Sequence, residues 1–335
     1  MTSRTRRILS VYAIVTLLST VFGAVQSPNG PVAMIAGGAA GALIGFWLAV
    51  FENSVREVWR RPLRRYQAWK IALVRAIVYL ASFYFVPELV GWIVSLLQPG
   101  ADPRATMGDR HILLYVAFAL GVNLLMAVRR MLGPRNLIAL AVGRYHRARP
   151  EERVVAFMDL KGSTPLAEKL GPARYHDFLN DVFFDAAGPI LEHGGEVYQY
   201  VGDEIVVTWR NDRGLRNAEC VAFLFALEDL LAAHRDVYLA EYDAFPSLRG
   251  ALHIGTLMVG EIGDLNRQIV MIGDTMNTAS RIEGVCRQFH RDYVASAALM
   301  ERLQALPDGV IRESLGTVHL AGKSGETELF ALKRA

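Results

Sequence analysis

Two aspartates in this chain follow strand-like runs and have the chemistry of metal ligands. Asp159 closes the apolar run VVAFMDL, and Asp203 follows Gly202 between two β-rich runs that are typical of a hairpin. If the run and the hairpin lie side by side, the two carboxylates meet at one edge of a sheet. Carboxylates that close repel each other unless a cation lies between them. The pattern therefore predicts a hard divalent cation such as magnesium, bridging two aspartates and a substrate triphosphate.

The segments around these aspartates alternate between helix and strand. The residues after Asp159 form a turn, and Ser163 or Thr164 is expected to cap a helix that extends to about His193. Further helices are expected over 217–234 and 275–287, and further strands over 248–254, 258–262, 269–272, 317–320 and 328–332. This order predicts an α+β sandwich for the C-terminal half of the chain.

Three motifs carry a family resemblance that spans roughly residues 150–335. FMDLKGST contains Asp159, YVGDE contains Asp203, and IGDTMNTASRIE follows in the same half. In this order and at this domain-like spacing, the motifs resemble the catalytic domain of class III adenylate and guanylate cyclases. The resemblance implies a ferredoxin-like sheet with helices on one side. It also implies a membrane-anchored enzyme that converts ATP to 3′,5′-cyclic AMP and pyrophosphate.

The resemblance assigns the acidic residues to metal binding. It implies that Asp159, its neighbour Leu160 and Asp203 hold two ions per site, as Mg²⁺ or Mn²⁺. Both ions suit oxygen ligands. One would lower the pKa of the attacking ribose hydroxyl, and the other would hold the β- and γ-phosphates.

The resemblance places three further residues on the substrate. Asn277 and Arg281 hold the positions of the catalytic residues that handle the ribose and the developing phosphate charge. Their spacing of four puts both on one helix face. Lys323, in LAGKSGE, holds the position of a lysine that binds the terminal phosphates. Basic side chains suit these places because negative charge builds on phosphate oxygens during the reaction.

The two base-reading positions depart from the family pattern. Gln199 stands where adenylate-making relatives often have lysine, and Val270 stands where they have aspartate. Gln199 offers a donor and an acceptor to a purine, whereas Val270 offers packing or its backbone. Adenine is the expected base, and a guanylate cyclase is the alternative.

The resemblance also implies a homodimer, because the metal carboxylates of one chain work with the asparagine, arginine and lysine of its partner. This chain carries both sets, so two copies could form two equivalent sites. A second alternative is a catalytically degenerate receptor or dimerisation module. The presence of Asp159, Asp203, Asn277, Arg281 and Lys323 together argues against it.

The first half of the chain has the composition of a membrane domain. Apolar residues make up 52% of the chain, and the long apolar runs fall within the first 145 residues. A transmembrane domain is predicted over 1–128 with spans at about 8–25, 32–51, 71–97 and 112–128, followed by a linker over 129–150 and a catalytic domain over 151–335. A signal peptide competes for the first run, but the next run follows after only SPNGP, which favours a transmembrane hairpin.

Basic residues predict the orientation in the membrane. The loop over 52–70 is rich in arginine, and Arg129 and Arg130 follow the last span, whereas the two other loops lack a basic excess. The N-terminus and the catalytic half are therefore expected in the cytoplasm of an integral protein of the cell inner membrane. The arginines indicate topology, with contact to membrane lipid as a further interpretation, and no nucleic-acid partner is expected.

Overall fold

The computed structural model describes residues 3–25, 30–57, 68–97, 117, 120–121, 143–264, 267–323 and 325–335. The chain divides into two compact units, residues 1–137 and 138–335, each with its own hydrophobic clusters.

The described part of the N-terminal unit contains three long apolar helices, α1 (Ser3–Val25), α2 (Pro31–Glu57) and α4 (Ala68–Leu97). The stretches Pro31–Ser54 and Leu73–Leu97 are long and apolar enough to cross a membrane, and Leu9–Val25 is a shorter apolar helix. By length and composition, these helices fit a helical transmembrane region. The fourth predicted span, 112–128, lies outside the described residues apart from 117, 120 and 121.

Small residues let α1 and α2 pack backbone against backbone. A Cβ on Gly23 would lie 2.1 Å from the carbonyl oxygen of Gly37, and a Cβ on Gly41 would lie 2.1 Å from that of Ser19. A larger residue at either position would force the helices apart. The glycines of AGGAAGALIG therefore serve helix packing within the chain.

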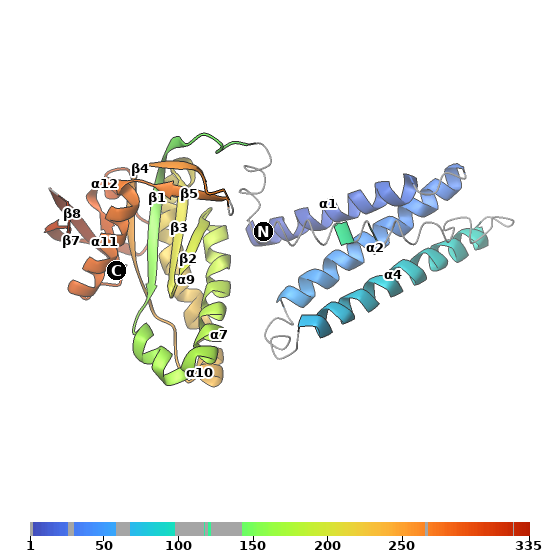
Figure 1. Cartoon of the computed structure of the whole chain (residues 1–335), viewed down its shortest axis with the longest axis horizontal. Helices are drawn as coiled ribbons and strands as arrows, with labels where there is room; N and C mark the ends of the chain where they lie inside the picture. Colours follow the sequence, from blue (N-terminus) through green and yellow to red (C-terminus); the bar gives the residue numbers. More distant parts are fainter. Residues whose placement is uncertain are drawn as a thin grey trace. The chain divides into compact units, whose positions relative to one another are not determined.

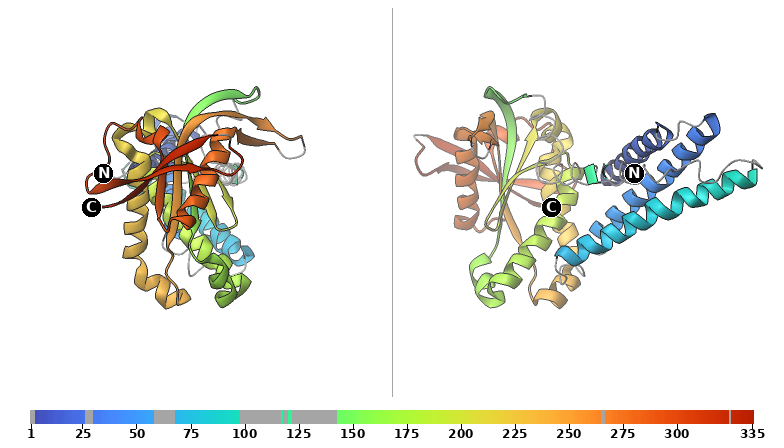
Figure 2. Two further views of the ribbon diagram at one scale, coloured as in Figure 1. Left: turned by 90° about the vertical axis from the view of Figure 1, so that its left-hand side faces the viewer. Right: turned by 45° about the vertical axis from the view of Figure 1, so that its right-hand side comes forward.

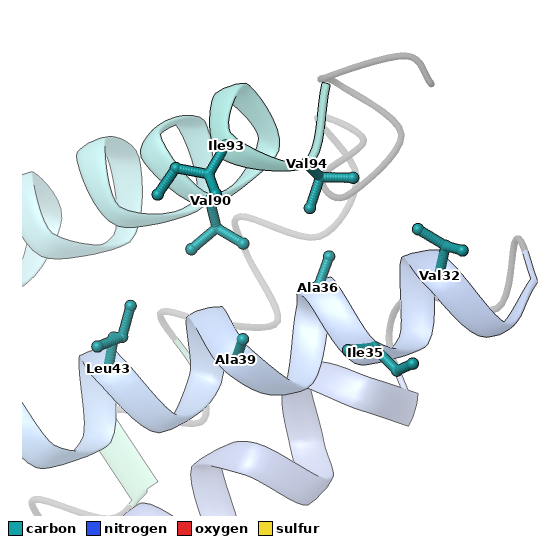
Figure 3. Close-up of a pocket in the computed structure, with 8 residues that line it drawn as sticks. All are labelled: Val32, Ile35, Ala36, Ala39, Leu43, Val90, Ile93 and Val94. Atoms are coloured by element: carbon teal, nitrogen blue, oxygen red, sulfur yellow. The ribbon is translucent and has the colours of Figure 1, made fainter. Parts of the chain in front are cut away.

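The helices α2 and α4 are separated by a groove along one part of their length and joined by polar contacts along another. An apolar groove of about 310 Å³ separates part of them (Figure 3), lined by Val32, Ile35, Ala36, Ala39, Leu43, Val90, Ile93 and Val94. Elsewhere the Tyr79 hydroxyl donates to Glu52 Oε1 at 2.9 Å, and Arg75 Nε lies 3.2 Å from the same oxygen. A polar cluster thus joins the two helices outside the groove.

The C-terminal unit is a mixed β-sheet with helices (Figure 1). The strand order is β2-β3-β1-β4-β6-β8-β7, with β5 paired to β4. The strands are β1 (Arg149–Leu160), β2 (Glu196–Val201), β3 (Glu204–Arg210), β4 (Leu248–Ile262), β5 (Gln268–Ile272), β6 (Tyr293–Ser296), β7 (Val310–His319) and β8 (Glu326–Arg334). The helices are α7 (Ser163–Glu192), α8 (Asn211–Gly214), α9 (Glu219–Ala233), α10 (Arg235–Tyr242), α11 (Asp274–Gln288) and α12 (Ala297–Met300), with a 3-10 turn over Arg216–Ala218.

The central strand β1 is covered on both faces. Val154, Ala156, Met158 and Leu160 pack in one cluster with α7, α9 and α10, whereas Val155 and Phe157 pack in another with Ala279 of α11. Figure 1 and Figure 2 show α7 and α11 on opposite sides of the sheet. The expectation of helices on one side only is therefore wrong. The unbroken apolar run of β1 agrees with helices on both sides, because such a run is typical of a strand that is buried on both faces.

One long strand replaces two predicted ones. The strands predicted over 248–254 and 258–262 are a single strand, β4, which pairs with β1 along its length from Arg149↔Val259 to Leu160↔Leu248. Gly255 lies inside β4, where Thr275 packs closely against it. A Cβ at this position would lie 2.5 Å from Thr275 Oγ1. The glycine marks a close packing contact, not a turn.

The turn after β1 also differs in detail. Gly162, with φ of 66°, is the N-cap of α7, and no side chain caps this helix. Ser163 is the first helical residue, and its hydroxyl interacts with Tyr175. The predicted cap at Ser163 or Thr164 is therefore wrong, because a glycine supplies the left-handed backbone that the turn needs.

Candidate active site

Asp159 is a buried carboxylate held by two arginines. It lies near the end of β1 and is 5% exposed. Arg249 Nε donates to its Oδ2 at 3.0 Å, and Arg287 Nη2 donates to the same oxygen at 2.9 Å. Arg249 is the direct partner of Asp159 in the β1–β4 register, and Arg287 comes from α11. Strand register and helix packing together fix the carboxylate.

Glu283 closes this arrangement into a network. Its Oε1 lies 3.2 Å from Arg249 Nε and 3.4 Å from Arg287 Nε. Burial raises the pKa of Glu283, and the charge of Glu283 raises the pKa of Arg287. Sequence reasoning missed all three residues. The spacing of four between Glu283 and Arg287 was a usable signal, whereas the approach of Arg249 depends on strand register.

Asp203 reaches the same edge of the sheet from the hairpin turn. Gly202 has φ of 61°, and Val201 pairs with Glu204, so Gly202 and Asp203 form the turn between β2 and β3. Because Met158 pairs with Ile205, the register places Asp159 and Asp203 at neighbouring strand ends. The Oδ2 atom of Asp203 is buried and lacks a hydrogen-bond partner among the described residues.

The charge at this edge is more negative than its partners can balance. Glu204 has its pKa raised to about 7, first by burial and then by the charges of Glu283, Asp159 and Asp203. Burial and then Asp203 also raise the pKa of the nearby Tyr175. An unsatisfied carboxylate oxygen in a negative field is the environment that a divalent cation stabilises.

The donor set fits a cation that takes its remaining ligands from substrate. Within the described ranges, no group of three or more His, Cys, Asp or Glu side chains is arranged to hold a metal by itself. Two carboxylates with a neighbouring backbone carbonyl, such as that of Leu160, leave ligand positions for phosphate oxygens and water.

The predicted substrate-binding residues gather around the first half of α11. Asn277 is exposed and Arg281 is half-buried on this helix. A Cβ on Gly322, which has φ of +72°, would lie 3.1 Å from Arg281 Nη2. The adjacent Lys323 places Nζ 2.9 Å from Asp274 Oδ2, and this contact lowers the pKa of Asp274. The structure therefore brings Arg281 and Lys323 together.

His253 is a half-buried neighbour of this basic group that sequence reasoning missed. Its Nδ1 lies 2.8 Å from Ser296 Oγ. Burial, then the charge of Lys323, lowers the pKa of His253 to about 4. The imidazole is therefore neutral near pH 7, and the charges that act on it include those of Lys323 and Asp274.

The predicted base-reading positions lie on two strands that are linked to each other. Gln199 is exposed on β2, and Val270 is half-buried on β5 opposite Gly260. The backbone N–H of Met271 donates to the Tyr198 hydroxyl at 3.1 Å. This hydrogen bond joins β2 to β5 directly beside both positions.

The acidic group (Asp159 and Asp203) and the basic group (Arg281 and Lys323) are linked to different parts of α11. Arg281 lies earlier on the helix than Glu283 and Arg287, which belong to the Asp159 network. In the part of the chain that the structure describes, no hydrogen bond or ion pair joins Arg281 or Lys323 to Asp159 or Asp203. The two groups therefore have separate polar contacts in the described part of the chain.

Sequence and structure comparisons relate the chain to known proteins. The Adenylate and Guanylate cyclase catalytic domain family matches residues 146–334. Adenylate cyclase 2 of Rhizobium meliloti (strain 1021) is 35% identical over 259 residues, which cover 75% of this chain and 71% of that protein. Retinal guanylyl cyclase 1 of Bos taurus is 30% identical over 193 residues, 55% of this chain and 16% of that protein. A bacterial light-regulated adenylyl cyclase aligns in structure with a TM-score of 0.56 and 17% identity, covering 68% of this chain and 66% of that one, which is a likeness of fold.

Proposed function

Because the chain belongs to the adenylate and guanylate cyclase family, we propose that it converts ATP to 3′,5′-cyclic AMP and pyrophosphate. Family membership confirms the resemblance that the three motifs indicate. The observation that carries the proposal is the meeting of Asp159 and Asp203 at one sheet edge, where Asp203 Oδ2 is buried and has no hydrogen-bond partner among the described residues. The named adenylate cyclases among the relatives support the same activity.

The reaction replaces a phosphoanhydride bond with a phosphate ester bond. The ribose 3′-oxygen forms a bond to the α-phosphorus, the bond from that phosphorus to the pyrophosphate oxygen breaks, and the hydroxyl proton passes to solvent water. Negative charge grows on the α-phosphate and on the leaving group. Two Mg²⁺ or Mn²⁺ ions, held by Asp159, Asp203 and the Leu160 carbonyl, would supply Lewis-acid stabilisation of that charge.

The basic group supplies the remaining contacts in this proposal. Asn277 orients the ribose, and Arg281 donates hydrogen bonds to the α-phosphate as its charge grows. Lys323 binds the terminal phosphates by exchanging the Asp274 carboxylate for phosphate oxygens.

The base is read by Gln199 and Val270 in the proposed complex. Gln199 is exposed and free to present its amide to the purine edge, while Val270 offers an apolar surface. Adenine is the proposed base. A guanylate cyclase is the second candidate, because a relative named retinal guanylyl cyclase 1 matches over the same half.

We place this activity in a membrane-bound homodimer. The exposed face of the β4–β5 ribbon carries Met258, Ile262 and Ile272, which are 42%, 54% and 55% exposed. Such an apolar face favours association with a second copy. Two copies would join the acidic half of one chain to the basic half of the other. The apolar helices would anchor the chain in the inner membrane with lipid around them and the catalytic unit in the cytoplasm.

A product assay on the purified full-length chain tests the proposal. ATP and GTP are offered separately with Mg²⁺ or Mn²⁺, and the cyclic products are quantified. We expect cyclic AMP from ATP, and no product from an Asp203→Asn variant that remains folded. Cyclic GMP as the main product would favour the guanylate cyclase. A folded, dimeric protein that makes neither product would support a non-catalytic receptor.

A further inference from the structure

Tyr145 is a buried aromatic residue that precedes the first strand of the sheet. It is 7% exposed, and β1 begins only at Arg149. Its hydroxyl donates to Glu151 Oε1 at 3.0 Å, and its carbonyl oxygen accepts the N–H of Glu261 at 3.0 Å. Burial and then Glu151 raise the pKa of its phenol. A residue in the segment that leads into the catalytic fold is thus anchored at both its backbone and its side chain.

The segment around Tyr145 lies against β4 at the place where β5 pairs. Ala148 is so close to Gly260 that a Cβ on the glycine would lie 2.8 Å from the Ala148 Cβ. In the β4–β5 ladder, Gly260 is the partner of Val270, and Glu261 is the partner of Ile269. The segment therefore contacts β4 at Gly260 and Glu261, the residues that pair with the proposed base-binding strand β5.

The cluster that contains Tyr145 touches every element that carries a proposed purine or ribose contact. Its partly buried members are Tyr198, Ile269, Met271 and Met276. In the chain, Tyr198 precedes Gln199, Ile269 and Met271 flank Val270, and Met276 precedes Asn277. The cluster also contains residues of β1 and β3, but Asp159 and Asp203 are held separately by register and by arginines.

We propose that Tyr145 is a positioning residue, whose ring fixes β5 and the start of α11 for binding of the purine and the ribose. This inference rests on the proposed function. Interiors are close-packed, so a missing ring leaves a cavity into which its neighbours shift. Among the described strands β5 pairs only with β4, and it is short and partly exposed, so we expect it to shift when the ring is lost. A shift of Val270 and Asn277 weakens nucleotide binding and leaves the metal carboxylates in place.

The test compares Tyr145→Ala with Tyr242→Ala in the full-length protein. Tyr242 is a matched control, since it is 3% exposed and its hydroxyl donates to Asp181 at 2.7 Å, but it packs on the opposite face of the sheet. Both variants lose a buried ring and a hydrogen bond to a carboxylate. Tyr145→Leu serves as a milder variant that keeps part of the volume, and Tyr145→Phe removes only the hydrogen bond.

Three readouts are measured for each variant: melting temperature, KM and kcat for ATP and GTP, and binding of a fluorescent ATP analogue without turnover. We expect Tyr145→Ala to raise KM for ATP about tenfold and to weaken analogue binding equally, with a smaller change in kcat. Tyr145→Leu should give an intermediate rise, and Tyr145→Phe should stay close to wild type. Tyr242→Ala should lower the melting temperature without changing KM.

Two results would overturn the inference. One is an unchanged KM and unchanged analogue binding in folded Tyr145→Ala or Tyr145→Leu. The other is an equal rise in KM in Tyr242→Ala at the same loss of melting temperature. If the wild type binds the analogue but makes no cyclic nucleotide, the proposed function fails while the binding comparison still tests Tyr145. A wild type that neither binds nor cyclises nucleotide would overturn both.

Discussion

The acidic and basic groups of the candidate active site differ in how they are held. Asp159 lies on the central strand, is almost fully buried, and belongs to a network with Arg249, Glu283 and Arg287. Lys323 lies in the loop between β8 and the edge strand β7 and forms an ion pair with the exposed Asp274. The acidic group is therefore part of the core, whereas the basic group can change partners when a substrate arrives. Even within the acidic group, Asp159 is neutralised and Asp203 is not.

The largest effect should come from Asp203→Asn. Removing this charge removes a proposed metal ligand, so we expect activity to fall at least about a hundredfold. Because Asp203 Oδ2 is buried and accepts no hydrogen bond from any residue that the structure describes, the melting temperature should equal or exceed that of wild type. Product formation and thermal unfolding are measured side by side, with the exposed Asp308→Asn as a control. Retained activity would remove Asp203 from the metal site.

Asp159→Asn should lower both the activity and the stability of the protein, in contrast to Asp203→Asn. We again expect loss of activity, but here also a loss of stability of about 3 kcal/mol, because Arg249 loses one of its two carboxylate partners in a buried network. Denaturant unfolding gives the free energy of unfolding for both variants. Equal stabilities for Asp159→Asn and Asp203→Asn would show that the network does not distinguish the two aspartates.

Substitutions in and beside the basic group should change the KM for ATP. Lys323→Met removes a proposed phosphate contact, and we expect KM for ATP to rise about tenfold. Asp274→Asn frees Lys323 from its competing carboxylate, so KM should fall or stay the same. Steady-state kinetics of both variants decide the point. A rise in KM for both would mean that Asp274 positions Lys323 and does not compete with substrate.

His253 should make the stability of the fold depend on pH. Its pKa is about 4 in the folded chain and about 6.5 when unfolded, so the unfolded chain binds more protons between these values. Stability is therefore complete above pH 6.5 and falls as the pH drops toward 4, by up to about 3 kcal/mol. His253→Asn should flatten this part of the stability curve, and His176→Asn, at an exposed site, should not. Parallel curves for wild type and His253→Asn would exclude this role.

Local patterns were enough to predict the acidic edge. The apolar run before Asp159 and the turn at Gly202 and Asp203 are local signals, and the structure contains both the strand and the hairpin. The three motifs gave the family because they combine such signals in a fixed order. Helix α11 was predicted within a residue at each end, since its apolar spacing is regular.

What could not be predicted depends on contacts between distant residues. Arg249 meets Asp159 through the β1–β4 register, and Gly255 continues a strand because Thr275 packs beside it. The placement of α11 on the second face follows from the topology and not from its own sequence. Tyr145 looked like part of a linker because its burial comes from strands that are far away in the chain.

A mixing experiment tests the central claim most directly, which is that one working site needs the acidic half of one chain and the basic half of another. Full-length Asp203→Asn and Arg281→Ala variants are assayed alone and after co-expression with different tags, and mixed dimers are purified through both tags. We predict that each variant alone is inactive, while an unselected mixture regains about a quarter of wild-type activity, since half of its dimers carry one intact site of two. Purified mixed dimers that remain inactive would contradict the claim.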